Sequence, residues 1–315
     1  MFEGVLPAII TPFSRNSSQS LNTRGLTENL EYLLSEGVDG VVPCGSTGES
    51  ATLTFDEHEK VIELTVDTVN GRVPVIAGTG SNNTAEAVRL TRAAKDLGAD
   101  AVLVISPYYN KPNRAGLIKH YTKLADIDIP VIMYNVPGRT GQNLEPDLVA
   151  ELAKNPNIVG IKEASGNISQ ISRIIEETCD DDFLVISGDD NMTMPIMALG
   201  GAGVISVAAN VAPKKMVAMS DAMRNGDFAT ALKIHYELAP VFRAMFIDTN
   251  PIPVKKAVEL CGMAAGPVRL PLDELDARKT EQLATALKAA GLTGSKKSPV
   301  KKPGKAKSAE KKGRR

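Results

Sequence analysis

Residues 84–104, TAEAVRLTRAAKDLGADAVLV, contain in one stretch the pattern from which the fold is predicted. Thr84 is a residue type that caps helices, and Gly98 suits the left-handed conformation that often ends them. The apolar positions between them recur at helical spacing and would form the buried face: Val88, Leu90, Ala94 and Leu97. The run AVLV that follows is short and apolar, as in a buried strand. The stretch therefore predicts a helix, a glycine and a strand in succession.

The same order recurs in LEYLLSEGVDGVV from Leu30 and in MPIMALGGAGVISV from Met194. Eight short apolar runs are candidate strands: VLPAII (5–10), GVVPC (40–44), VPVIAG (73–78), AVLVIS (101–106), VIMYNV (131–136), IVGIK (158–162), FLVIS (183–187) and GVISVA (203–208). Most gaps between them have room for a helix and two loops, as in repeated βα units with a parallel sheet. This count favours an α/β fold of the (β/α)8 TIM-barrel class over a doubly wound sheet, although Pro43 is unfavourable in a central strand.

The strand patterns stop after Pro213. Three helical segments follow: residues 227–246, 253–263 and 272–292. In the last, Leu283 and Leu287 stand one turn apart and Gly291 closes the helix. We therefore predict a barrel catalytic domain at 1–224, a C-terminal helical subdomain at 225–292 and a disordered Lys-rich tail at 293–315, which has no apolar periodicity.

Charge is distributed unevenly along the chain. The formal net charge is −1, but residues 296–315 hold ten Lys or Arg and one acidic residue, Glu310, which leaves 26 basic and 36 acidic residues upstream. The basic tail is either a solvated extension or a weak, salt-sensitive contact for nucleic acid and other acidic surfaces.

The cysteines and the N-terminus favour a cytoplasmic protein. Cys44, Cys179 and Cys261 are odd in number and widely spaced, which fits neither a disulfide framework nor a CxxC metal site. The N-terminus has no basic region before its short apolar run, so a signal peptide is not expected, and no apolar stretch reaches the ~20 residues that a membrane span needs.

Function in a (β/α)8 barrel gathers at the carboxyl ends of the strands, and Lys162 ends the run IVGIK. Strand alternation places Lys162 on the same face as Gly160, which would leave space beneath the lysine stem. Burial lowers the pKa of a lysine, and its free amine can then attack a ketone to form a Schiff base. The alternative is a strand-end lysine whose ammonium group reaches solvent.

Other strand ends supply candidate partners for this lysine. Tyr134 ends the neighbouring run and could pass protons, although a buried structural tyrosine is the alternative. Arg139, in the turn-prone stretch PGRTG, suits a carboxylate, and otherwise it is a solvated loop arginine. Ser46 and Thr47, in a glycine-flanked loop, could hold an anion or relay protons, or simply form a turn.

Other chemistries have less support. His58, His120 and His235 lie far apart and form no metal-binding spacing, so we expect no metal site. Asp189 and Asp190 could ligate a divalent ion, but two aspartates in a turn more often cap a helix. Phosphate-loop and dinucleotide fingerprints are absent from the sequence.

Six ordered motifs resemble the dihydrodipicolinate synthase (4-hydroxy-tetrahydrodipicolinate synthase) family, within the pyruvate-dependent class I aldolase and lyase superfamily. They are GSTGES (45–50), SPYYNKP (106–112), YNVPGRTG (134–141), GIKEASG (160–166), SGDD (187–190) and GVISV (203–207). The resemblance covers residues 1 to about 292 in collinear order. It does not include the basic tail.

The resemblance implies catalytic roles. Lys162 matches the lysine that forms an imine with pyruvate, and Tyr134 matches the proton donor and acceptor beside it. Thr47 and Tyr109 match the other members of the proton relay, with Tyr109 reaching into the neighbouring subunit's active site. That implies a dimer, and the family is usually a homotetramer made of two dimers.

The resemblance also implies substrate contacts. Ser46, Thr47 and the backbone at Ile205 match positions that hold pyruvate, and the backbone at Gly188 faces the second substrate. Arg139 matches the arginine with which the synthases bind the carboxylate of L-aspartate-4-semialdehyde, and which sialic acid lyases generally lack.

The implied reaction condenses pyruvate with L-aspartate-4-semialdehyde to 4-hydroxy-tetrahydrodipicolinate, the committed step toward diaminopimelate and lysine. The protonated imine is the electron sink, so no metal or organic cofactor is expected. Two alternatives stay open: a related aldolase, such as N-acetylneuraminate lyase or a 2-keto-3-deoxy sugar acid aldolase, and a catalytically inactive barrel that acts as a scaffold through its tail.

An allosteric lysine site is a further implied feature. Six residues match the family's lysine pocket at the subunit interface: Ser50, Ala51, His58, Asn82, Glu86 and Tyr108. Phe55 departs from the histidine of some inhibited enzymes, so feedback inhibition stays a hypothesis.

Overall fold

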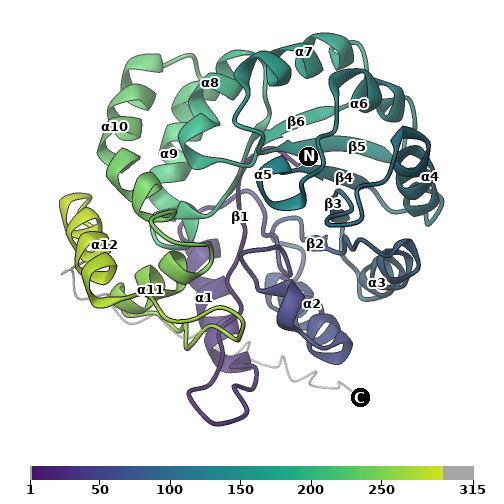
Figure 1. The fold of residues 1–315 in the computed structure, drawn as a ribbon. Helices are drawn as coiled ribbons and strands as arrows, with labels where there is room; N and C mark the ends of the chain where they lie inside the picture. The colour runs from purple at the N-terminus through teal and green to yellow at the C-terminus, as the bar shows by residue number, and fades with distance from the viewer. Residues whose placement is uncertain (1, 294–315) are drawn as a thin grey trace, which may run out of the picture.

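Parallel strands form the centre of the computed structural model, which describes residues 2–293. In this part of the chain seven strands form one sheet in the order β1-β7-β6-β5-β4-β3-β2. Their bounds are β1 Gly4–Pro7, β2 Ile76–Gly78, β3 Ala101–Ile105, β4 Val131–Asn135, β5 Ile158–Glu163, β6 Leu184–Ser187 and β7 Gly203–Ser206. Because all seven strands are parallel, their carboxyl ends lie on the same side of the molecule. Figure 1 shows the curled sheet from one of its ends.

The run around Val41, predicted as a strand, forms only isolated bridges. Val42 bridges Ala8 and Val41 bridges Val75, both in the parallel sense, so this short segment lies between β1 and the start of β2. Pro43 has no N–H to continue the ladder, although its carbonyl accepts from the backbone N–H of Gly78 at 2.9 Å. Within the described residues, seven strands and one two-residue bridge segment therefore occupy the eight apolar runs.

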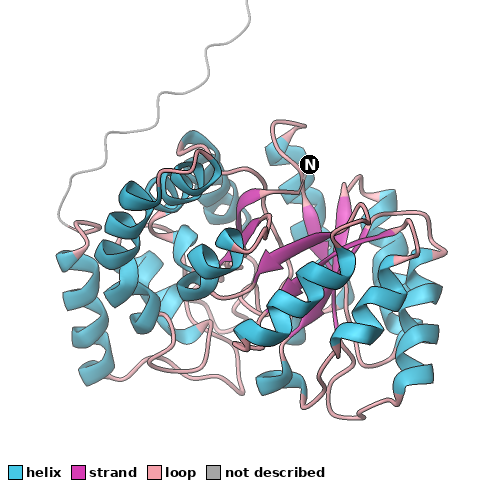
Figure 2. Ribbon diagram, turned by 90° about the horizontal axis from the view of Figure 1, so that it is seen from above, coloured by secondary structure: helices cyan, strands magenta, loops and turns pink. Residues whose placement is uncertain are grey.

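Helices surround the sheet, and Figure 2 shows strands between helices on both sides. The helices that follow or link the strands are α1 Thr23–Ser35, α2 Phe55–Val69, α3 Thr84–Asp96, α4 Arg114–Ala125, α5 Pro137–Thr140, α6 Pro146–Ala153, α7 Ile168–Thr178, α8 Thr193–Ala198 and α9 Pro213–Arg224. Three short 3-10 turns are η1 Ser50–Thr52, η2 Asp190–Met192 and η3 Ala208–Asn210. The alternation of βα units predicted from the sequence is confirmed.

Helix α3 lies where the pattern of residues 84–104 predicts a helix, but its capping residue differs from the predicted one. The side chain of Asn83, not Thr84, caps α3 by accepting from the N–H of Ala85. Thr84 instead bonds through its hydroxyl to Nδ1 of His120 at 2.9 Å. Gly98 has a φ of +88°, the left-handed conformation that the sequence predicts there.

Three more helices, α10 Phe228–Ala244, α11 Ile252–Leu260 and α12 Ala277–Ala289, lie beside the sheet and its ring of helices (Figure 1). Leu283 and Leu287 lie in α12, one turn apart as predicted, and both are fully buried. The helix begins at Ala277 because Asp276 caps it. One apolar cluster joins residues of all three helices to Val5 of β1 and Val204 of β7. The C-terminal helices therefore share a core with the sheet, and the boundary at residue 224 stays a prediction.

Within residues 2–293, no helix combines the length and apolar character needed to cross a membrane. The predicted disordered tail lies outside the described residues, except for Thr293.

Candidate active site at the carboxyl ends of the strands

A cavity of about 120 Å³ lies where the strands end. Seven residues singled out in the sequence line it: Ser46, Thr47, Tyr134, Arg139, Lys162, Gly188 and Asp189. They come from four segments between residues 46 and 189, and the parallel sheet brings them together by aligning the carboxyl ends of its strands. The fold thus assembles most of the predicted site.

Lys162 is buried at the end of β5, with only 6% of its surface exposed. Burial lowers its pKa from 10.5 to about 7; the negative charge of Asp190 acts in the opposite direction, and the positive charge of Arg139 lowers the pKa further. Lys162 forms no ion pair within residues 2–293, and its Nζ lies 4.2 Å from the centre of the Tyr134 ring. The solvent-reaching lysine is therefore excluded, and a large share of this amine is uncharged at neutral pH.

The space beside the Lys162 stem comes from Gly188. A Cβ at Gly188 would lie 3.0 Å from Cε and 3.1 Å from Cγ of Lys162. Gly160, predicted to provide this space, instead lets the strands approach, since a Cβ there would lie 2.6 Å from the carbonyl oxygen of Leu184. That prediction is wrong because Gly160 sits against the adjoining strand and Gly188 sits against the lysine.

Tyr134 pairs directly with Lys162 in the register of β4 and β5. Burial raises the pKa of its phenol to about 12, while Arg139 and a hydrogen bond with the Ser46 side chain lower it. The phenol is therefore protonated at neutral pH and can donate a proton to a group bound at Lys162.

Two predicted members of the relay form no hydrogen bond with Tyr134 within residues 2–293. Thr47 is buried at the cavity wall, but its hydroxyl accepts from Nδ2 of Asn250 at 3.0 Å. Tyr109 is 89% exposed and has a φ of +71°. It lines neither this cavity nor the larger cavity beside it, which is described below. Ser46 is thus the hydroxyl-bearing residue whose side chain influences the pKa of Tyr134 within the chain, and the role of Tyr109 in a neighbouring subunit stays a prediction.

Arg139 lies on the four-residue helix α5 rather than in an open loop. Its Nη2 donates to the backbone carbonyl of Asn250 at 2.9 Å, which holds the guanidinium at the rim of the cavity. Asn250 is 5% exposed, and its Oδ1 has no hydrogen-bond partner among the described residues. A carboxylate near this rim would meet a fixed cation.

Sequence reasoning missed Asn250 because it belongs to the C-terminal segment, about 200 positions from Thr47. Its only local signal is an asparagine before Pro251 at a break between two helical patterns. The apolar side chain of Phe246, from the same segment, also lines the cavity.

Asp190 stands behind the cavity rather than in a metal site. Its carboxylate accepts from the hydroxyl of Ser206 at 2.5 Å and from the N–H groups of Val207 and Ala208. Burial raises its pKa to about 6, against these hydrogen bonds. Asp189 caps η2, as the alternative for this pair predicted. No group of three or more metal-ligating side chains is found in residues 2–293.

Ile205, expected to hold pyruvate through its backbone, is fully buried in β7 and pairs with Leu6. Val207, two residues further along, lines the cavity instead. The backbone role of Ile205 stays a prediction.

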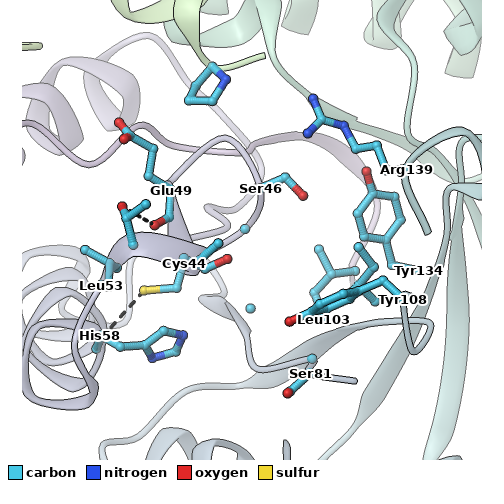
Figure 3. A pocket seen from close by; sticks show the side chains of 18 of the residues that line it. Cys44, Ser46, Glu49, Leu53, His58, Ser81, Leu103, Tyr108, Tyr134 and Arg139 are labelled. Carbon is cyan, nitrogen blue, oxygen red and sulfur yellow. Dashed lines mark hydrogen bonds between the residues drawn. The ribbon is translucent and has the colours of Figure 1, made fainter. Parts of the chain in front are cut away.

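A larger cavity of about 420 Å³ adjoins the first and shares Ser46, Tyr134 and Arg139 with it (Figure 3). Five of the six residues matched to a lysine pocket line it: Ser50, Ala51, His58, Glu86 and Tyr108. The sixth, Asn82, donates to the backbone carbonyl of Tyr108 at 3.2 Å. Burial lowers the pKa of His58 to about 4, so its ring is neutral near pH 7. Phe55 packs its ring 3.9 Å from the guanidinium of Arg89 and is not among the lining residues.

Comparisons with known proteins find relatives over most of the chain. A protein of Methanoculleus marisnigri named 4-hydroxy-tetrahydrodipicolinate synthase is 75% identical over 287 residues, covering 91% of this chain and 99% of that protein. A crystal structure of the chloride-inhibited dihydrodipicolinate synthase from Acinetobacter baumannii, complexed with pyruvate, matches with a TM-score of 0.90 and 41% identity, over 93% of this chain and 100% of that one. The lysine-bound dihydrodipicolinate synthase from Cyanidioschyzon merolae matches with a TM-score of 0.89 and 40% identity, over 92% and 99% of the two chains. The model of the Dihydrodipicolinate synthetase family matches residues 1–290, and the chain belongs to this family.

Proposed function

We propose that this protein condenses pyruvate with L-aspartate-4-semialdehyde to form 4-hydroxy-tetrahydrodipicolinate, a step of diaminopimelate and lysine biosynthesis. The observation that carries the proposal is the buried amine of Lys162, with a pKa of about 7, beside the phenol of Tyr134. The 75% identical relative bears the name of this synthase, and a structural relative was crystallised with pyruvate.

In this mechanism the neutral amine of Lys162 adds to the keto carbon of pyruvate and forms a carbinolamine. Tyr134 donates a proton to the departing hydroxyl, water leaves, and a protonated imine remains. Loss of a proton from the methyl group gives an enamine, whose carbon attacks the aldehyde. The amine of the second substrate then displaces the lysine nitrogen, which closes the ring and restores Lys162. No metal or organic cofactor enters these steps.

The proposed substrate contacts combine the lining of the cavity with the family resemblance. Ser46 and Thr47 line the cavity and would hold pyruvate, together with the backbone at Ile205 that the resemblance implies. Arg139 at the rim would bind the carboxylate of the semialdehyde. The backbone at Gly188 faces the second substrate, next to the lysine stem.

We further propose a closed (β/α)8 barrel, with the bridge segment at Val41 and Val42 counted as its eighth strand. The exposed Tyr109 supports assembly into dimers, and two dimers would form a homotetramer in the cytoplasm. The larger cavity would bind lysine as a feedback inhibitor, and the basic tail would make weak contacts with acidic surfaces.

The function is tested by a reductase-coupled assay with pyruvate and aspartate semialdehyde, run beside cleavage assays with sialic acid and 2-keto-3-deoxy sugar acids. Turnover is expected only with the semialdehyde. Efficient cleavage of a sugar acid with no semialdehyde turnover would instead assign a related aldolase, and no turnover in any assay would favour a scaffold.

Arg139→Ala is expected to raise KM for aspartate semialdehyde by about 10- to 100-fold, because a charge-assisted contact to one carboxylate contributes roughly 1.5–3 kcal/mol. Borohydride trapping of pyruvate on Lys162 should change far less. Steady-state kinetics with each substrate varied in turn separates the two effects. An equal loss for both substrates would contradict the assignment of Arg139 to the second one.

The rate of imine formation is expected to rise with pH and to level off just above neutrality. Below pH 7 the amine of Lys162 is mostly protonated and cannot attack, and above pH 7 it is mostly neutral, because its pKa is about 7. An ordinary lysine would keep gaining rate beyond pH 9. Borohydride trapping of pyruvate, followed by mass spectrometry from pH 5.5 to 9.5, measures the midpoint. A rate still rising steeply at pH 9 would contradict the lowered pKa.

A further inference from the structure

The loop at residues 44–50 carries groups of the catalytic cavity on one side and a buried carboxylate on the other. Ser46 and Thr47 line the cavity with Tyr134, while Glu49 follows only two residues after Thr47. Figure 3 shows Ser46 and Glu49 on this loop, with the Glu49 carboxylate directed away from Tyr134. Anything that fixes Glu49 therefore also fixes the backbone that presents Ser46 and Thr47.

Glu49 is fixed by a fully buried ion pair with α11. Its Oε1 lies 2.6 Å from Nζ of Lys255, and the two side chains are 0% and 2% exposed. The other carboxylate oxygen accepts from the backbone N–H of Arg269 at 2.9 Å, and Lys255 also donates to the carbonyl of Pro267 at 2.6 Å. Each charge is thus hydrogen-bonded as well as paired, which a buried pair requires.

The backbone of the 44–50 loop is left-handed at Glu49. Glu49 has a φ of +54° and a ψ of 36°, a left-handed conformation that is uncommon for a residue with a side chain. Such conformations persist where neighbouring contacts determine them, and they gather at functional sites. The ring of Phe13 closes the pocket around the pair, with its centre 4.2 Å from Nζ of Lys255.

The same C-terminal segment reaches the catalytic cavity a second time. Asn250, five residues before Lys255, donates to the hydroxyl of Thr47 and accepts from Arg139 through its carbonyl. The C-terminal segment therefore holds the loop at Thr47 and at Glu49, on both sides of Gly48.

We propose that Glu49 and Lys255 are positioning residues for the reaction, through which α11 holds the 44–50 loop so that Ser46 and Thr47 meet the substrate at Lys162. The C-terminal helices are then part of the active-site architecture, although they supply no nucleophile. This inference rests on the proposed function, and it assigns to the ion pair a task beyond stability.

The test is Lys255→Met, which removes the charge and keeps a long apolar side chain over Phe13. KM for pyruvate is expected to rise by about 10- to 100-fold, because small displacements of binding groups have effects of this size. Lys256→Met is the matched control: Lys256 is the next residue on α11 and pairs on the surface with Glu259. The control should keep the wild-type KM.

Two further variants keep the test decisive if Lys255→Met folds poorly. Glu49→Gln retains the shape of the side chain, and Glu49→Gln with Lys255→Met removes both buried charges together. All kinetics are measured at temperatures where circular dichroism shows the variants folded. If Lys255→Met, Glu49→Gln or the double variant is folded and keeps the wild-type KM for pyruvate and the wild-type kcat, the proposal is overturned and the ion pair has a purely structural role.

Amide hydrogen exchange separates this inference from the proposed function, because it needs no substrate. Residues 44–50 are expected to exchange at least about tenfold faster in Lys255→Met than in Lys256→Met, while the strands keep their protection. If residues 44–50 exchange faster in Lys255→Met but the wild-type chain fails to bind pyruvate, the proposed function is rejected and the loop attachment is retained. Unchanged exchange at 44–50 would reject the attachment itself.

Discussion

Lys162→Ala is expected to abolish the covalent adduct that pyruvate forms with the protein under borohydride, and to lower kcat on the order of 10⁴-fold or more. Among the described residues that line the cavity, only Lys162 carries a primary amine, the group that forms an imine. Intact-mass spectrometry should show the increase for wild type and none for the variant, and peptide mapping should place it at residue 162.

The fold should survive this substitution. Burial disfavours the charged form of Lys162, so the pKa of this lysine is lower in the folded chain than in the unfolded chain. Below the pKa of the unfolded chain, protonation of Lys162 therefore favours unfolding. Substitution by alanine removes this destabilising effect. We expect Tm at pH 7 to stay at or above the wild-type value. Lys154→Ala is the control, because Lys154 is an exposed lysine just before β5 that pairs with Asp181. An undiminished adduct in Lys162→Ala would show that another residue is the nucleophile.

Much of the fold follows from patterns that are local in sequence. Apolar runs and glycine stops locate the strands and most helices, because burial and backbone conformation are properties of short segments. Two differences between the predicted and observed elements have local causes. Pro43 shortens the second run to a bridge, and Asp276 delays the start of α12 by capping at a position that the sequence placed inside the helix.

The residues of the site that lie at strand ends could be predicted from the sequence, because strand alternation determines which way their side chains point. Lys162 and Tyr134 could be placed at neighbouring strand ends, and their register pairing follows from the parallel sheet. Contacts between distant segments left no such signal. Asn250 meets Thr47 across 203 positions, and Gly188 rather than Gly160 gives the lysine stem its space, because only the folded chain brings those atoms together.

Tyr134→Phe is expected to lower kcat by about 10²- to 10⁴-fold, the range for removing a positioned proton donor and acceptor. The substitution keeps the ring whose centre lies 4.2 Å from Nζ of Lys162 and removes only the hydroxyl group. Because the environment of the amine is retained, pyruvate should still be trapped on Lys162, more slowly, with the midpoint of its pH profile still near 7. Stopped-flow trapping and steady-state turnover measure the two effects separately.

Tyr121→Phe provides the matched control for this change. Tyr121 is fully buried, its hydroxyl lies 3.5 Å from the carbonyl of Val104, and it does not line the cavity, so its loss should affect Tm rather than kcat. A Tyr134→Phe variant that retains more than about half of the wild-type kcat would mean that protons reach the carbinolamine by another route. In that case Ser46 or a solvent molecule, rather than the phenol, would have to supply the proton, and Tyr134 would serve only to pack its ring against the lysine.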